Sequence, residues 1–533
     1  MEIKVQAIEG YAYGAIQPSV LFYFKDIGNI QALLSHALEN FLSGLPASED
    51  VSLFEGNNFV EDSETAPSRF LRAVEALNKY CDDQRFTGIK VFEQDKMLVY
   101  ALPTLSTSMT RHNVSALKQF IHETNGVFSS SDVIKLAEKL KTHCRRYLPS
   151  GTNAGNFIAA AAEHKIPFKI FSNRYLIFGY ASGSTIFNSS ITDQESAIGV
   201  SLAKSKYVTN KFLRLSGFPV AGQARIASAK DAIKFARENG YPLVLKPENE
   251  EQGRGIFANI TNKQDLLDCY SKVLKDFDKI LIETHIAGYH YRIDFMEEKL
   301  IKAVRRQAPM IVGDGYKSVQ LLIDALNKDP ERLDPASSKK MVVLDDDLYR
   351  CLAIQNIMID DVLPKGRTIF LKSISNLSRG GEQVHVESEV HPENLALCKS
   401  VARAMRLQIA GIDILSKDIS KPWYTNGAAI CEVNAQPQLG KGRTEIYWSV
   451  LREFLRPPAE VTLNVSSKQS FGRSALYDTD LSQVNISLSV ADVLSKGAPT
   501  QYINKLEIAD DVSEADRRTL KQMLVSVMPE QIQ

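Results

Sequence analysis

Two short segments, Ala410–Leu415 (AGIDIL) and Ala428–Ala435 (AAICEVNA), decide how this chain folds. Both are apolar enough to be predicted as strands. Glu432 and Asn434 are two residues apart on the second strand, so their side chains point to one face. Asp413 lies on the first strand between two isoleucines that face the other way. If the strands pair antiparallel, three oxygen-bearing side chains converge, and oxygens are the ligands that Mg²⁺ prefers. Without further context, a solvated polar face of a half-exposed sheet explains the same residues.

A second group of residues is suited to holding phosphate. Lys246 ends an apolar strand predicted over Tyr241–Lys246, so its ammonium would emerge at the rim of a sheet. Seven residues later begins the Gly-Arg-Gly loop Gly253–Gly255, whose backbone N–H groups can approach a phosphate closely. Lys206 lies upstream, at the start of a predicted helix. Two lysines and a glycine loop can cradle a triphosphate, although a Gly-Arg-Gly tripeptide alone is more often only a turn.

Arg305 and Arg306 end a hairpin strand predicted over Lys299–Arg306, shortly before Gly313-Asp314-Gly315. Alternation along a strand directs only one of the two side chains into a cleft. A guanidinium there suits a developing oxyanion or a transferring phosphoryl group. The alternative is an exposed strand arginine without a chemical role.

The bulk composition is that of a globular protein. The chain has 533 residues, which predicts about three domains, and it carries 63 basic and 63 acidic residues. A balanced charge without basic runs argues against nucleic acid or a membrane surface as the partner. The N-terminus does not resemble a secretory signal, and no apolar stretch is long enough for a membrane span. Six scattered cysteines without metal-ligand spacing fit a reducing compartment, so the predicted location is cytoplasmic.

The element pattern predicts a mixed α/β (α+β) chain. Near the N-terminus we expect a strand over Ser19–Lys25, helices over Ile30–Leu45 and Ser68–Cys81, and a hairpin over Lys90–Leu102. Further predicted elements are a strand at Ile166–Phe178, helices starting at Ser228 and Thr261, a strand at Lys279–Ile286, the hairpin His290–Met296 with Lys299–Arg306, and a helix at Pro392. Arg456-Pro457-Pro458 predicts a boundary before a small α/β appendage.

Read in order, these pieces resemble the ATP-grasp superfamily, and within it the cyanophycin synthetase branch. The matching motifs run in the family's order over about 150–460, and the resemblance is fainter over 1–150. They are Glu195–Lys211 (ESAIGVSLAKSKYVTNK), Tyr241–Pro247 with Gly253–Ile256, Ile282–Arg292 (IETHIAGYHYR), Val304–Gly315 (VRRQAPMIVGDG), Asn376–Gly381 (NLSRGG) with Ser388–Asn394, and Ala410–Leu415 with Glu432–Leu439.

The resemblance implies a role for each matched residue. One of Arg305 and Arg306 would stabilise the tetrahedral intermediate. The nucleotide-binding residues would be Lys206, Lys246, Gly253, Arg254, Gly255, Glu283, Ile286 and His290. The residues on the carboxylate-substrate side would be Ser196, Arg292, Asn376, Ser378, Gly380 and Gly381. The Mg²⁺ ligands would be Asp413, Glu432 and Asn434.

The resemblance also implies an architecture and an activity. We expect an N-terminal α/β domain (1–160), an ATP-grasp domain (161–458) with a lid at about 206–288, and a small C-terminal extension (459–533). The expected enzyme uses ATP and Mg²⁺ to join a carboxylate to an amine through an acyl-phosphate, on amino acid or short peptide substrates. The alternatives are a γ-glutamyl or glutathione-type ligase, or a catalytically silent scaffold. The family's self-association allows a homo-oligomer.

Four departures from the family lie mainly on the substrate side. The Mur-ligase-like module of cyanophycin synthetase has no counterpart in this sequence. His290 replaces an Asp expected to face the ribose, and His385 replaces an Asp in the loop leading to His391. Gly179–Thr185 (GYASGST) differs from the family's loop. The same reaction on a different carboxylate or amine is therefore the hypothesis. The alternative to a functional role for His290, His385 and His391 is a structural or solvent-facing role.

Overall fold

The computed structural model describes residues 2–25, 31–45, 65–94, 97–172, 174–248, 255–297, 299–333, 339–372, 380–440, 444–468, 474–477 and 482–524. It divides into two compact units. One combines Met1–Asp193 with Gly440–Gln533, and the other is Gln194–Leu439. The three-part division expected from the sequence remains a prediction. No helix among the described residues is long and apolar enough to cross a membrane.

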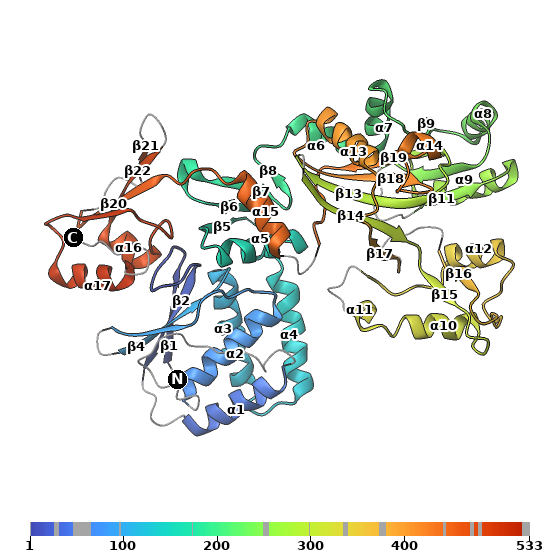
Figure 1. Cartoon of the computed structure of the whole chain (residues 1–533). Helices are drawn as coiled ribbons and strands as arrows, with labels where there is room; N and C mark the ends of the chain where they lie inside the picture. The colour runs from blue at the N-terminus through green and yellow to red at the C-terminus, as the bar shows by residue number, and fades with distance from the viewer. Residues whose placement is uncertain are drawn as a thin grey trace. The chain divides into compact units, whose positions relative to one another are not determined.

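The first unit begins with an antiparallel sheet in the order β1-β2-β4-β3. Its strands are β1 (Glu2–Ile8), β2 (Ser19–Lys25), β3 (Lys90–Gln94) and β4 (Met97–Pro103). The accompanying helices are α1 (Gln31–Ser43), α2 (Ala66–Tyr80), α3 (Thr107–Glu123) and α4 (Ser130–Cys144) (Figure 1). The predicted strand, two helices and hairpin of this region are thereby confirmed.

A second small sheet of this unit packs on a pair of helices. The segment predicted as one strand at Ile166–Phe178 is instead a hairpin of β5 (Phe168–Phe171) and β6 (Tyr175–Phe178). A positive φ at Ser172 accompanies the reversal. The sheet continues with β7 (Thr185–Asn188) and β8 (Ile191–Thr192). Helices α5 (Thr152–Glu163) and α15 (Thr444–Phe454) contact each other, and Phe157 of α5 meets Tyr447 of α15 edge to face.

The C-terminal segment is bound directly to the N-terminal one. It contains β20 (Glu460–Ser466), β21 (Ser474–Tyr477), β22 (Gln483–Ser489), α16 (Val490–Lys496), β23 (Lys505–Ile508) and α17 (Glu514–Leu524). Tyr11 and Ala498 exchange two backbone hydrogen bonds of 2.9 Å, and the buried Tyr11 ring joins the core of this segment. This segment contains strands and helices, as expected from the sequence, and it shares one compact unit with the N-terminal sheet.

The second unit holds two larger sheets. The first has the order β11-β10-β12-β9. Its strands are β9 (Gln223–Ile226), β10 (Leu243–Pro247), β11 (Phe257–Ile260) and β12 (Ile280–Thr284). Helices α8 (Ala229–Asn239) and α9 (Lys263–Asp276) pack on it around a core that includes Leu245 and Ile282. Ser228 caps α8 as predicted, whereas Asn262, and not Thr261, caps α9.

The other sheet of this unit is antiparallel, in the order β17-β14-β13-β18-β19. Its strands are β13 (Tyr289–Met296), β14 (Lys299–Gln307), β17 (Glu382–His385), β18 (Ile409–Ser416) and β19 (Ala429–Asn434). Its neighbouring helices are α6 (Ala197–Ala203), α7 (Lys206–Leu215), α13 (Pro392–Ala404) and α14 (Trp423–Asn426). One face is apolar and packs on α13 (Figure 1). Antiparallel pairing of β18 and β19 confirms the condition on which the predicted oxygen cluster depends.

A smaller lobe within this unit has a core of its own. It consists of β15 (Met310–Val312), α10 (Val319–Leu326), α11 (Pro330–Leu333), α12 (Asp346–Ile354) and β16 (Thr368–Phe370). Ile311 and Ile369 are paired across the two strands and buried against the helices.

Candidate active site

The site is built on the polar face of the five-stranded sheet, the face opposite α13. Strand alternation and register bring eight charged or polar side chains to this face. They are His290, Arg292, Asp294, Lys302, Arg306, Asp413, Glu432 and Asn434. A register shift beside Asp413 leaves Cys431 as an extra residue in β19, a bulge of the kind that re-aims side chains near active sites.

Asp413 is the centre of this face. Its carboxylate is buried and lies 3.2 Å from Arg292 Nη1, 3.6 Å from Arg306 Nη2 and 3.6 Å from His290 Nε2. Asn434 Nδ2 donates to Asp413 Oδ2 at 3.4 Å. Burial by itself would raise the pKa of Asp413, but Arg306, Arg292 and His290 together lower it well below its usual range. Asp413 is therefore held as an anion.

Arg292 is buried on this face, where it contacts the carboxylates of Asp294 and Asp413. It donates through Nε to Asp294 Oδ1 at 2.6 Å, and Lys302 Nζ lies 3.1 Å from the other oxygen of Asp294. Burial by itself would lower the pKa of Arg292, but the carboxylates of Asp413 and Asp294 raise it above its usual value. A Cβ on Gly411 would lie 2.1 Å from Arg292 Nη2, so only glycine leaves room for the guanidinium. This buried network makes Arg292 a structural support for Asp413.

The two candidate arginines point to opposite faces. Arg306 pairs with His290 and reaches Asp413 on the polar face, with its side chain 21% exposed. Arg305 pairs with Tyr291 on the other face, and its guanidinium lies 5.1 Å from the centre of the Tyr289 ring. The sequence predicted that only one of the pair enters the site, and the geometry selects Arg306.

Lys246 extends from the neighbouring sheet toward this face. It is buried and its Nζ lies 2.7 Å from Glu283 Oε1, on the adjacent strand β12. Gln223 also donates a short hydrogen bond to the same oxygen. Burial disfavours the ammonium, but Glu283 first, and then Cys431 and Glu432, raise its pKa overall. Since Glu432 belongs to the five-stranded sheet, its charge and that of Lys246 interact between the two sheets.

Lys206 is the first residue of α7. The helix is capped by Ser205, whose hydroxyl accepts from Val208 N and donates to Glu248 Oε1 at 3.3 Å. Glu248 in turn accepts from Arg225 Nε at 2.8 Å. The Arg225 guanidinium lies 4.1 Å from the centre of the Tyr207 ring. This chain of contacts fixes the helix start, and with it the backbone at Lys206.

The other predicted site residues have varied surroundings. Ser196 caps α6 by accepting from Gly199 N at 3.1 Å, so its hydroxyl has a local structural use. Gly255 has φ +71°, and a Cβ there would lie 2.5 Å from Phe277. The Gly380 carbonyl accepts from the buried Arg332 Nη1 at 2.7 Å. Ile286 follows β12 and is half-buried, as is Glu432. Gly381 is buried next to Gly380. Gly253, Arg254, Asn376 and Ser378 lie outside the described residues.

The expected Mg²⁺ ligands offer two carboxylates and one amide. The described part of the chain holds no group of three or more His, Cys, Asp or Glu side chains arranged for a metal. Asp413, Glu432 and Asn434 nevertheless share one face on adjacent strands. One or two carboxylates completed by phosphate oxygens is the usual protein environment of Mg²⁺. These residues fit an ion that arrives with a nucleotide and do not form an all-protein metal cage.

Sequence reasoning missed several residues that hold the site together. Asp294, Lys302, Gln223, Glu248 and Arg225 had no predicted role. The alternation of His290, Arg292 and Asp294 along one strand was the available signal for Asp294. Lys302 lies opposite Asp294 in the same hairpin. Gln223, Glu248 and Arg225 act through contacts between separate elements, Gln223 with Glu283 and Arg225 with Glu248.

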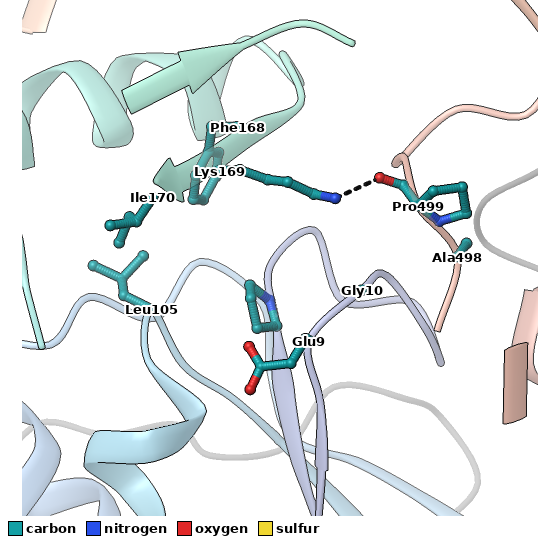
Figure 2. A pocket seen from close by; sticks show the side chains of 9 residues that line it. Glu9, Gly10, Leu105, Phe168, Lys169, Ile170, Ala498 and Pro499 are labelled. Atoms are coloured by element: carbon teal, nitrogen blue, oxygen red, sulfur yellow. Dashed lines mark hydrogen bonds between the residues drawn. The ribbon is translucent and has the colours of Figure 1, made fainter. Parts of the chain in front are cut away.

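A separate cavity of about 250 Å³ lies within the first unit, lined by residues of both chain ends (Figure 2). Lys169 Nζ donates to the Pro499 carbonyl at 2.7 Å, and Thr107 donates a short hydrogen bond to Glu9. Both charged side chains thus have hydrogen-bond partners within this unit, and we assign the cavity no ligand.

Residues 344–452 match the model of the RimK-like ATP-grasp domain family. This segment is thus similar in sequence to ATP-grasp domains, in agreement with the resemblance that the sequence motifs indicate.

Among characterised proteins, it is similar to cyanophycin synthetases. It is 30% identical over 292 residues to that of Synechocystis sp. and 32% identical over 291 residues to that of Nostoc sp.. Each alignment covers 54% of this chain and 33% or 32% of the relative, so the chain spans about a third of their length. It is also 24% identical over 371 residues to the glutathione biosynthesis bifunctional protein of Streptococcus mutans, covering 67% of this chain and 48% of that protein. A bifunctional glutathione synthetase structure from Pasteurella multocida aligns with 15% identity and a TM-score of 0.44, covering 82% of both chains.

Proposed function

We propose that this chain is an ATP-dependent carboxylate–amine ligase that forms an amide or peptide bond through an acyl-phosphate. One observation carries the proposal. A buried lysine from one sheet, Lys246, interacts with Glu432 on a second sheet whose polar face presents Asp413, Asn434 and Arg306. Cations for phosphate, oxygens for Mg²⁺ and one inward arginine are the components that phosphoryl transfer to a carboxylate requires.

Each residue has a defined task in this scheme. Lys246, held by Glu283, and Lys206, at the fixed start of α7, bind the ATP phosphates. Asp413, Glu432 and Asn434 would hold Mg²⁺, which would supply neutralisation of charge on the transferring phosphoryl group. The substrate carboxylate attacks the γ-phosphate, giving an acyl-phosphate and ADP. The amine then attacks the acyl carbon and phosphate leaves, while Arg306 stabilises the oxyanion.

The proposed substrates are amino acids or short peptides. The similarity to cyanophycin synthetases supports this class. The sheet β9–β12 with α8 and α9 would act as the lid of about 206–288 that excludes water from the acyl-phosphate. The ribose of ATP would meet His290.

The test is ADP release from Mg-ATP with amino acids and dipeptides offered in pairs, with products checked by mass. ADP release that requires both a carboxylate and an amine, together with a condensation product, is expected. The control is Lys246→Met in the same panel, with circular dichroism to confirm folding. No release from any pair, combined with no Mg-ATP binding by calorimetry, would favour a silent scaffold.

A glutathione-type ligase is the second candidate. The alignment with the Streptococcus mutans glutathione biosynthesis protein favours it because it covers more of this chain than the cyanophycin synthetase alignments do. Glutamate with cysteine, and γ-glutamylcysteine with glycine, belong in the panel. Turnover of only one or both of these pairs would identify the chain as a glutathione-type ligase.

A further inference from the structure

Two free cysteines of the first unit, Cys81 and Cys144, lie against each other in its interior. Cys81 is the C-cap residue of α2, and Cys144 is the last residue of α4. Both side chains are buried, and a hydrogen bond joins the two thiols. Direct contact between the sulfurs is what a disulfide requires, since cysteines whose side chains point apart cannot be bridged without backbone movement.

Asn113 of α3 holds this thiol pair in place. In the neutral pair, Cys144 Sγ donates to Asn113 Oδ1 at 3.4 Å, and Asn113 Nδ2 lies 4.0 Å from Cys81 Sγ. The same amide nitrogen donates to Asn78 Oδ1 at 2.9 Å, and Asn78 Nδ2 donates to Thr110 Oγ1, also at 2.9 Å. All of these side chains are buried, so α2, α3 and α4 fix the two sulfurs through one continuous hydrogen-bonded network.

Contact between the thiols makes one of them the more acidic. The hydrogen bond with Cys81 lowers the pKa of Cys144, although burial and the charge of Asp83 act to raise it. The same contact first, and then burial, raises the pKa of Cys81. When the pair ionises, Cys144 therefore carries the thiolate and Cys81 donates its proton to it in a hydrogen bond. The thiolate is the reactive form of cysteine, so Cys144 is the nucleophile of the pair.

The other cysteines differ in this respect. Burial raises the thiol pKa of all four, which are Cys269, Cys351, Cys398 and Cys431. Among the six cysteines, all of which lie in the described residues, Cys144 is thus the one whose pKa is lowered. Four thiols of the chain are inert by burial, whereas the first unit contains an acidified thiol with a second thiol beside it.

The thiol pair lies close to the surface, although both sulfurs are buried. Asp82 and Arg145, which directly follow the two cysteines, are exposed. Each thiol therefore belongs to the end of a helix, where local opening costs less free energy than opening of the core. Such opening admits a peroxide, which is little larger than water.

We propose that Cys81 and Cys144 form a redox site, a dithiol that a peroxide oxidises to a disulfide between α2 and α4; this role does not depend on the proposed ligase function. The Cys144 thiolate sulfur attacks one peroxide oxygen, the O–O bond breaks, and the departing hydroxide takes up a proton to give water. Cys144 is then a sulfenic acid. The Cys81 sulfur attacks the Cys144 sulfur, the S–S bond forms, the S–O bond breaks, and hydroxide leaves with the Cys81 proton as a second water. The two thiols are oxidised, one peroxide is reduced to two waters, and a small dithiol reverses the change by exchange.

The test is oxidation of the whole folded chain with hydrogen peroxide, followed by peptide mapping without reductant. Remaining thiols are alkylated in denaturant before digestion, and the peptides are identified by mass spectrometry. We expect a cross-linked pair of peptides that carries Cys81 and Cys144, with the other four of the six cysteines alkylated. Dithiothreitol should remove the cross-link. No such cross-link in the folded native chain, or cross-links that join other cysteines as often, would overturn the proposal.

Serine variants test which thiol reacts first. The variants are Cys81→Ser, Cys144→Ser and the control Cys269→Ser, which removes a buried thiol of the other unit. Circular dichroism confirms folding, and dimedone traps any sulfenic acid. Cys269→Ser should form the cross-link as the native chain does. Cys81→Ser should give a dimedone adduct at Cys144, because the serine hydroxyl can still donate to the thiolate, whereas Cys144→Ser should give little adduct at Cys81. More adduct at Cys81 in Cys144→Ser than at Cys144 in Cys81→Ser would refute Cys144 as the nucleophile.

Discussion

Arg305 and Arg306 provide a matched pair of substitutions on adjacent residues of one strand. Arg306 reaches Asp413 on the polar face, whereas Arg305 lies over Tyr289 on the other face. Removing one donor to a developing oxyanion costs about 10²–10³ in rate, or roughly 3–4 kcal/mol of transition-state stabilisation. Arg306→Ala should therefore lower kcat by that factor. Arg305→Ala removes a half-exposed cation–π contact of at most about 1 kcal/mol and should leave kcat within a few-fold.

Folding is not expected to confound this comparison. Asp413 keeps Arg292 at 3.2 Å when Arg306 is removed, so no uncompensated buried charge is created. The assay is steady-state ADP release with the active substrate pair, alongside thermal unfolding of both variants. Arg306→Lys should recover part of the rate, because it restores the charge without the planar fork. Equal losses from Arg305→Ala and Arg306→Ala, or a larger loss from Arg305→Ala, would refute the assignment of the polar face as the active site.

Three further predictions concern the metal, the buried network and pH. Glu432→Gln should raise the Mg²⁺ concentration needed for half-maximal ADP release several-fold, because one ligand loses its charge; an unaltered metal titration would remove Glu432 from the site. Arg292→Met should destabilise the second unit by about 3–5 kcal/mol in chemical denaturation, since Asp294 and Asp413 lose their shared partner; a loss under 1 kcal/mol would show that the network is not structural. Burial raises the pKa of Asp83 to about 7, although hydrogen bonds from Thr104 and Leu105 act to lower it. The folded chain thus holds a proton that the unfolded chain releases near pH 4, so the free energy of unfolding should fall between about pH 4 and 7. The fall is up to ~4 kcal/mol, and it is smaller to the extent that solvent screens this half-buried group. Asp83→Asn should flatten that slope in urea titrations across the range, and an unchanged slope would contradict the assignment.

Local pattern was enough to predict much of the second unit. Strand alternation predicted that Glu432 and Asn434 share a face and that only one of Arg305 and Arg306 enters the site. Antiparallel pairing of β18 and β19 was the stated condition for adding Asp413, and the register places it opposite Glu432. These predictions depend on residues two apart or on adjacent elements.

Contacts between distant segments could not be predicted from local pattern. The ion pair of Lys246 and Glu283 depends on the register of β10 against β12, which a long connection separates. The union of the two chain ends depends on the bridge between Tyr11 and Ala498. Even the cap of α9 differed by one residue, because Asn262 has the stronger capping side chain.

The proposed ligase activates its carboxylate substrate as an acyl-phosphate. The most direct measurement uses a carboxylate substrate labelled with a heavy oxygen isotope and follows the label into the products by mass spectrometry. We expect one labelled oxygen to appear in inorganic phosphate for each amide bond formed, and none in ADP. Label in AMP, or unlabelled phosphate accompanying amide formation, would contradict it.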